Sequence, residues 1–100
     1  MNSLKSNTDH RGVQTLTMHR PEVHNAFDAC MIAELTDALL AAQEDGSVRI
    51  VVITGSGSCF SAGADLNWMR SLVDASEADN EADALRLAKL MRSLNYLSKP

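Results

Sequence analysis

Four consecutive β-branched residues, Ile-Val-Val-Ile at residues 50–53, run directly into a segment of glycines and other small side chains at residues 55–64. A β-branched run of this length is typical of a strand buried inside a sheet. Where such a strand ends in small residues before a helix, backbone N–H groups are left to bind anions, or a carbonyl oxygen that becomes negatively charged. The sequence therefore predicts a buried strand, a loop with a backbone binding site, and a helix that begins near residue 65.

The spacing within this loop excludes three well-known backbone sites. No Gly-Lys-Ser/Thr follows the glycines, as a P-loop requires. Phe60 occupies the position of the third glycine of a dinucleotide-binding fingerprint. Ser56 and Ser58 lack the Gly-x-Ser-x-Gly context of a nucleophilic serine. The alternative that stays open is a plain strand–loop–helix connection, in which small residues permit close packing.

Two strands and a helix are expected up to this loop. Residues 12–18 alternate apolar and polar side chains, as a half-buried strand does. Between residues 28 and 44 apolar side chains recur at three- and four-residue steps, which predicts a helix capped by Asp28 and stopped by Gly46. The strand at residues 50–54 lies parallel to the first one if this helix is a crossover.

Two helices are expected after the loop. Residues 68–73 indicate a short helix with one apolar face, and Ser76 is a suitable N-cap for the next helix. That helix, at about residues 78–97, is expected to turn one apolar side toward the core. The apolar residues of this side are Leu87, Met91 and Leu94, with Leu90 and Leu97 adjoining.

Two motifs in this order resemble the enoyl-CoA hydratase/isomerase (crotonase) superfamily. The first, Arg-Pro-x-x-x-Asn-Ala at residues 20–26, resembles the family's exit from its first strand. The second is the loop itself, where Gly-x-Gly and an aromatic residue precede Ala-Gly-Ala-Asp at residues 62–65. The resemblance extends from about Gly12 to the end of the chain. The strings at residues 21–27 and 64–69 are most similar to methylglutaconyl-CoA hydratases.

This resemblance implies an α/β fold, the N-terminal portion of a crotonase-like (ClpP/crotonase) ββα spiral core. Residues 12–100 are expected to form an incomplete domain of this kind, and residues 1–11 a flexible leader. Residues 98–100 resemble the lead into the third core strand, before which the chain is truncated. Since family domains are much longer, the chain is expected to be a fragment or a truncated gene product.

Composition limits the partners. The net charge is −4, from 9 basic and 13 acidic residues without a basic cluster, which argues against a nucleic-acid partner. No apolar run is long enough for a membrane span, and the polar N-terminus lacks a signal or transit pattern, which favours a cytoplasmic protein.

Cys30 and Cys59 have no C-x-x-C spacing and are interpreted as free, packed thiols. The histidines, His10, His19 and His24, have no partner at metal-ligand spacing, so no metal site is expected.

The resemblance also assigns candidate site residues. The backbone N–H of Ala64 is implied to be the first donor of an oxyanion hole, and Gly63 permits an unusual backbone angle beside it. The acid/base glutamates are implied to be absent from this chain, in which no motif places a carboxylate pair. The residues implied to contact the substrate or its coenzyme A portion are Val23, His24, Ala62, Ala64, Asp65, Leu66 and Asn67.

Two details of this assignment stay open. Val23 stands where many family members have a phosphate-binding lysine, and Glu22 beside it has the wrong charge, although His24 can contribute when protonated. Trp68 and Met69 are implied to line or back the acyl pocket, but at helical spacing they are equally suited to the core.

The implied activity is the addition of water to an enoyl-CoA thioester, with 3-methylglutaconyl-CoA as the expected substrate. Coenzyme A enters as part of the substrate, with no permanently bound cofactor, and the full-length protein is expected to be a homotrimer or hexamer. The 100-residue chain alone is expected to be inactive. Two alternatives remain: a non-catalytic acyl-CoA-binding module, and another crotonase reaction (isomerisation, decarboxylation or thioester hydrolysis) that uses the same oxyanion hole.

Overall fold

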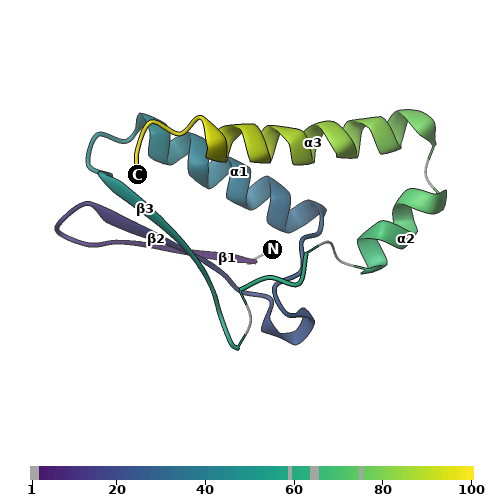
Figure 1. The fold of residues 1–100 in the computed structure, drawn as a ribbon, viewed down its shortest axis with the longest axis horizontal. Coiled ribbons are helices and arrows are strands. Elements are labelled where there is room, and N and C mark those ends of the chain that lie inside the picture. Colours follow the sequence, from purple (N-terminus) through teal and green to yellow (C-terminus); the bar gives the residue numbers. More distant parts are fainter. Residues whose placement is uncertain (1–2, 59, 64–65, 75) are drawn as a thin grey trace.

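The computed structural model describes residues 3–58, 60–63, 66–74 and 76–100, which form one three-stranded sheet and a layer of helices. The elements in chain order are β1 Leu4–Thr8, β2 Val13–Met18, the 3₁₀ helix η1 Pro21–Val23, α1 Ala29–Glu44, β3 Ile50–Gly55, α2 Leu66–Asp74 and α3 Glu77–Asn95. The strand order is β1-β2-β3. Helices α1 and α3 lie together on one face of the sheet, and α2 lies beyond the end of α1 (Figure 1).

Strands β2 and β3 are parallel neighbours connected by α1. Val13 lies opposite Ile50 and Met18 lies opposite Gly55. The predicted strand–helix–strand unit is therefore confirmed. Because parallel strands end at the same edge of a sheet, the segments that follow β2 and β3 begin side by side.

Strand β1 differs from the sequence expectation. The polar residues 1–11 predict a flexible leader, but residues 4–8 form an edge strand antiparallel to β2, with Leu4 opposite Met18. Only Leu4 is partly buried, and the other four residues of the strand are exposed. An exposed edge strand needs no apolar alternation, since backbone hydrogen bonds to β2 hold it in place, so the usual sequence signal was missing.

The turn between β1 and β2 is held by Asp9. Its carboxylate accepts the backbone N–H of Arg11 at 2.8 Å and that of Val13 at 3.1 Å, and it pairs with the Arg11 guanidinium at 2.9 Å. The Arg11 side chain, followed by the Val13 backbone N–H, holds the pKa of Asp9 below its ordinary value of 3.8. The ionised carboxylate of Asp9 is therefore the form that holds the turn. Gly12 closes the turn with φ +83°, where a Cβ atom would lie 2.6 Å from the Ser47 carbonyl oxygen.

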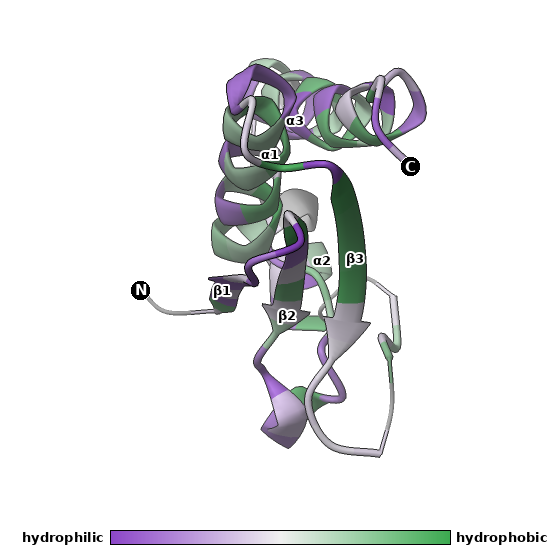
Figure 2. Ribbon diagram, turned by 90° about the vertical axis from the view of Figure 1, so that its left-hand side faces the viewer, coloured by the Kyte–Doolittle hydropathy of each residue, from purple (hydrophilic) through white to green (hydrophobic). Residues whose placement is uncertain are grey.

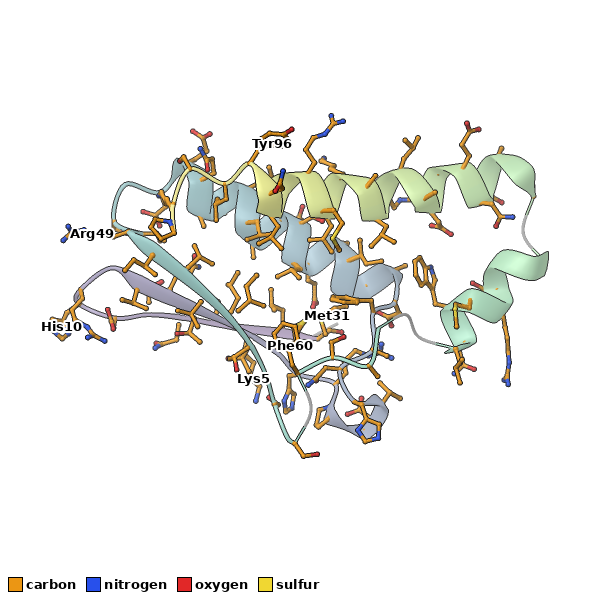
Figure 3. All side chains as sticks on the ribbon, viewed as in Figure 1. Lys5, His10, Met31, Arg49, Phe60 and Tyr96 are labelled. Carbon is orange, nitrogen blue, oxygen red and sulfur yellow. The ribbon has the colours of Figure 1, made fainter. Side chains whose placement is uncertain are left out.

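Helix α1 supplies most of the core. As predicted, Asp28 caps it, since Oδ1 of Asp28 accepts the backbone N–H of Met31 at 2.8 Å. The helix ends at Glu44, as predicted, with Asp45 as C-cap directly before Gly46. Its buried residues follow the predicted steps: Met31, Ile32, Leu35, Thr36, Leu39 and Ala42. The four largest apolar ones, at positions 31, 32, 35 and 39, pack with Leu16 and Met18 of β2 and with Leu90 of α3. Figure 3 shows Met31 on the sheet side of α1 and Tyr96 on the opposite side of the helix layer.

Strand β3 is covered on one face only among the described residues. Val51 and Ile53 pack against the core, whereas Ile50 and Val52 are each 41% exposed. The prediction that residues 50–53 are buried throughout is wrong for this structure, because both helices that cover the sheet lie on the same face (Figure 2). The apolar run is real, but only alternate side chains of it reach the core.

Helices α2 and α3 confirm the two predicted helices, and Ser76 caps α3 by accepting the backbone N–H of Asp79 at 3.1 Å. The predicted apolar side of α3 needs correction, since Leu90 is 1% exposed while Met91 and Leu94 are 47% and 44% exposed. Steps of three and four residues fit both stripes, so periodicity alone could not choose between them. Within the described ranges, no helix combines the length and apolar character that crossing a membrane requires.

The last three residues lie beside the start of β3 (Figure 1). The carbonyl oxygen of Pro100 accepts the backbone N–H of Val51 at 2.8 Å. The Lys99 ammonium group donates to the carbonyl oxygens of Ala42 at 2.6 Å and Asp45 at 2.5 Å, at the C-terminal end of α1. A cation at a helix C-terminus is stabilised by the unpaired carbonyls and the helix dipole.

Candidate active site

The candidate site lies at the edge of the sheet where β2 and β3 end. Two segments continue from this edge, the turn at residues 19–27 and the loop at residues 55–63. The backbone N–H of Ser56 donates to the carbonyl oxygen of Met18 at 2.9 Å, which extends the parallel pairing beyond β3. The Ser56 hydroxyl lies 2.9 Å from Nδ1 of His19. The two motifs singled out in the sequence are thus neighbours in space.

Asn25 connects the turn to the loop. Its side chain is 0% exposed. Oδ1 of Asn25 accepts the backbone N–H of Arg20 at 2.7 Å, and Nδ2 donates to the carbonyl oxygen of Ser56 at 2.9 Å. His24 and Asn25 both have positive φ, 53° and 55°, a conformation that asparagine tolerates better than most residues. Sequence reasoning gave Asn25 no role, although a buried polar residue with these bonds holds both strand exits together.

The end of the loop is docked on the turn by backbone hydrogen bonds. The N–H of Ala62 donates to the carbonyl oxygen of His24 at 2.9 Å, and the N–H of Phe27 donates to that of Gly63 at 2.6 Å. Gly63 has φ +94°, so the expected unusual backbone angle is confirmed. Phe60, the aromatic residue of the loop, is 57% exposed and does not belong to the core.

The side chain of Ser61 adds two further bonds at the same place. Its hydroxyl donates to the carbonyl oxygen of Asn25 at 2.9 Å and accepts the backbone N–H of Gly63 at 3.1 Å. A single hydroxyl therefore bridges the turn and the loop.

A pocket of about 670 Å³ opens beside the docked loop, between the turn and α2. Five of the predicted contact residues line it: Val23, His24, Ala62, Leu66 and Asn67. The other two, Ala64 and Asp65, lie outside the described residues, as does Cys59. The structure thus brings together every predicted contact residue that it describes, while the roles of these residues remain predictions.

Three further residues line this pocket, namely Ala26, Met69 and Arg70. Met69 and Arg70 lie three and four residues after Leu66, so one face of α2 carries all three, and this spacing was the available signal. Arg70 is the only permanently charged side chain among the described lining residues. Trp68 packs against the core instead. Of the two roles left open by the sequence, Trp68 therefore takes the core position and Met69 lines the pocket.

The described part of the pocket contains neither a carboxylate nor a cluster of metal ligands. No carboxylate is among its described lining residues. The described residues also contain no group of three histidine, cysteine or acidic side chains that could hold a metal ion. Cys30 is a free thiol in α1. A second hollow of about 640 Å³ lies between α1 and α3, with Leu39 and Tyr96 among its lining residues, and contains none of the predicted site residues.

Comparison with known proteins gives the same family throughout the chain. Residues 8–98 match the family model described as enoyl-CoA hydratase/isomerase. The trans-2-decenoyl-[acyl-carrier-protein] isomerase of Streptococcus mutans is 38% identical over 88 residues, which cover 88% of this chain and 32% of the isomerase. A probable enoyl-CoA hydratase of Mycobacterium bovis is 40% identical over 84 residues, which cover 84% of this chain and 32% of that protein. The crystal structure of an enoyl-CoA hydratase from Shewanella pealeana matches with a TM-score of 0.94 and 37% identity, covering 99% of this chain and 37% of that one.

These matches confirm the predicted α/β crotonase fold. The chain spans about a third of the length of these relatives, 32% to 37%. Hydratases, isomerases and dehalogenases all occur among the relatives, so family membership alone does not select one reaction. The family model covers nearly the whole chain, and the chain belongs to the enoyl-CoA hydratase/isomerase family.

Proposed function

We propose that this chain forms the N-terminal part of an acyl-CoA hydratase that adds water to an enoyl-CoA thioester. The observation that supports the proposal most is the pocket where the turn after β2 meets the loop after β3. Both motifs of the family contribute to it, and the loop ends there in a left-handed glycine at Gly63. A pocket beside an end of a parallel sheet is a common position for a ligand in α/β proteins.

In the proposed reaction, water adds to the conjugated double bond and the thioester carbonyl oxygen gains negative charge. The backbone N–H of Ala64 donates a hydrogen bond to that oxygen. One such donor is worth on the order of 3 kcal/mol of transition-state stabilisation, by analogy with oxyanion holes in acyl transfer. The acid and base that move the protons are glutamates outside this chain, in keeping with the absence of carboxylates among the described lining residues.

The proposed substrate is a branched unsaturated acyl-CoA, with 3-methylglutaconyl-CoA as the first candidate. The resemblance of residues 21–27 and 64–69 to methylglutaconyl-CoA hydratases supports this choice. Asp65, Leu66 and Asn67 are proposed to follow the coenzyme A portion, with Val23 and His24 in the turn that flanks its adenine end. The intact enzyme is proposed to be a cytoplasmic homotrimer or hexamer, with no permanently bound cofactor.

Arg70 is proposed to supply the positive charge that Val23 does not. It lines the pocket from α2, and a guanidinium group there can pair with a coenzyme A phosphate. Replacing Arg70 with glutamine should weaken binding of coenzyme A about tenfold, since a hydrogen bond to a charged group is worth roughly 1.5–3 kcal/mol. Calorimetric titration measures this affinity. Pantetheine, which lacks the nucleotide phosphates, should bind both forms equally, and Arg92→Gln outside this pocket is the matched control. Equal coenzyme A affinity of wild type and Arg70→Gln would remove Arg70 from the site.

The activity itself is tested by comparing two lengths of chain. The 100-residue chain should show no turnover of an enoyl-CoA, whereas the intact enzyme should consume the conjugated thioester, as followed by its ultraviolet absorbance. Turnover by the 100-residue chain would contradict the placement of the acid/base groups outside it. Binding of acyl-CoA by the intact protein without any reaction would favour the binding module, and a product other than the 3-hydroxyacyl-CoA would favour another crotonase reaction.

A further inference from the structure

We infer that the hydroxyl of Ser61 is a positioning group for the oxyanion donor, an inference that rests on the proposed function. Ser61 has no assigned part in binding or chemistry. Its hydroxyl nevertheless makes two hydrogen bonds, to the carbonyl oxygen of Asn25 at 2.9 Å and from the N–H of Gly63 at 3.1 Å. These bonds connect the end of the loop to the clamp formed by Asn25.

The argument depends on the peptide unit that follows Gly63. Its carbonyl oxygen accepts the N–H of Phe27 at 2.6 Å. A peptide unit is planar and almost always trans, so a carbonyl held in one direction sends the N–H of the same unit in the opposite direction. The proposed oxyanion donor, the N–H of Ala64, belongs covalently to this peptide unit, although Ala64 itself lies outside the described residues. We therefore expect the bonds that hold Gly63 to influence the donor.

Ser61 holds the backbone N–H of Gly63, whereas Phe27 holds its carbonyl oxygen. Gly63 has φ +94° and open space where a Cβ atom would be, so packing of a side chain does not restrain it. Without the Ser61 hydroxyl, the N–H of Gly63 loses its acceptor and the carbonyl oxygen of Asn25 loses a donor. The glycine is then held on one side only, by Phe27, and rotation about its φ and ψ angles moves the donor.

This role predicts a particular kinetic signature for Ser61→Ala in the intact enzyme. A misaligned donor should lower kcat about 10- to 100-fold and raise KM much less, because the bond to the carbonyl oxygen is strongest with the negative charge that develops in the transition state. The thioester carbonyl stretch of a bound, unreactive acyl-CoA, measured by isotope-edited infrared spectroscopy, should lose most of its shift to lower frequency. Ser58→Ala removes a hydroxyl from an exposed position of the same loop and should change neither value.

The isosteric pair Ser61→Thr and Ser61→Val keeps the test decisive if Ser61→Ala folds poorly. The threonine form should keep kcat and the carbonyl shift, and the valine form, which has the same shape without the hydroxyl, should lose both. If the hydroxyl-free forms are less stable but retain kcat and the shift, Ser61 is only structural and the inference is overturned. If wild-type protein binds acyl-CoA without any carbonyl shift, the oxyanion role itself fails and the inference falls with it. The wild-type measurement therefore separates the two failures.

Discussion

Replacing Asn25 with alanine should lower the free energy of unfolding by about 4 kcal/mol, since each buried group left without a partner costs roughly 1–3 kcal/mol. Two partly buried groups lose the bond that Asn25 provides, the backbone N–H of Arg20 and the carbonyl oxygen of Ser56. Alanine also loses the tolerance of asparagine for the left-handed conformation seen at φ 55°. The change is measurable as a lower urea midpoint with an unchanged slope.

Two variants control this experiment. Asn25→Asp keeps the acceptor for Arg20 but sets a buried carboxylate against the carbonyl oxygen of Ser56, so at neutral pH it should destabilise the protein at least as much as Asn25→Ala. Asn80→Ala alters the same residue type at an exposed position of α3 and should not lower stability, because alanine is the better helix former. A loss of less than about 1 kcal/mol for Asn25→Ala would mean that Asn25 does not hold the two strand exits together.

Replacing the peptide bond before Ala64 with an ester should lower kcat of the intact enzyme about 100- to 1,000-fold, the usual cost of removing one oxyanion donor. The substitution exchanges the N–H for an oxygen and leaves every side chain unchanged. Cys59 provides a ligation junction five residues before this position, so the altered segment can be introduced by chemical synthesis. Initial rates with an enoyl-CoA and calorimetric binding of coenzyme A are the two measurements.

The ester also weakens the carbonyl of Gly63 as an acceptor, so a control must separate stability from catalysis. An ester before Phe60 removes an N–H from an exposed residue of the same loop and should leave kcat unchanged. Affinity for coenzyme A should be similar in both esters, since the donor acts on charge that develops in the transition state. Retention of kcat by the Ala64 ester would exclude its N–H from the mechanism.

The sequence allowed the main supersecondary unit to be predicted because its signals are local. The alternation in β2, the β-branched run in β3 and the cap at Asp28 each act within a few residues, and each element forms where it was predicted, although β3 is only half buried. The pocket followed from resemblance, and the turn and the loop do meet at it. Arg70 was missed although it lies one helical turn after Leu66, because the face of α2 that meets the pocket depends on the direction in which α2 leaves the loop.

Three other features depend on packing that the sequence does not reveal. The edge strand β1 has one partly buried side chain, so it resembles a polar tail until β2 is present to pair with it. The exposed face of Ile50 and Val52 depends on which face of the sheet the helices cover. The stripe of α3 that reaches the core passes through Leu90 rather than Met91, a rotation that helix α1 decides. The role of Asn25 likewise depends on packing, because its bonds to Arg20 and Ser56 exist only once the chain has folded.

The bonds that close the candidate site join residues far apart in the chain, with 36 positions between Ser61 and Asn25 and 37 between Ser56 and His19. Contacts of this range carry a loop-closure cost that must be met before they contribute stability. Local helix formation in α1 shortens the intervening segment and brings the two strand exits together. We therefore expect the pocket to assemble late and cooperatively in folding, so that substitutions in the buried face of α1 slow maturation of the site without touching any residue within it.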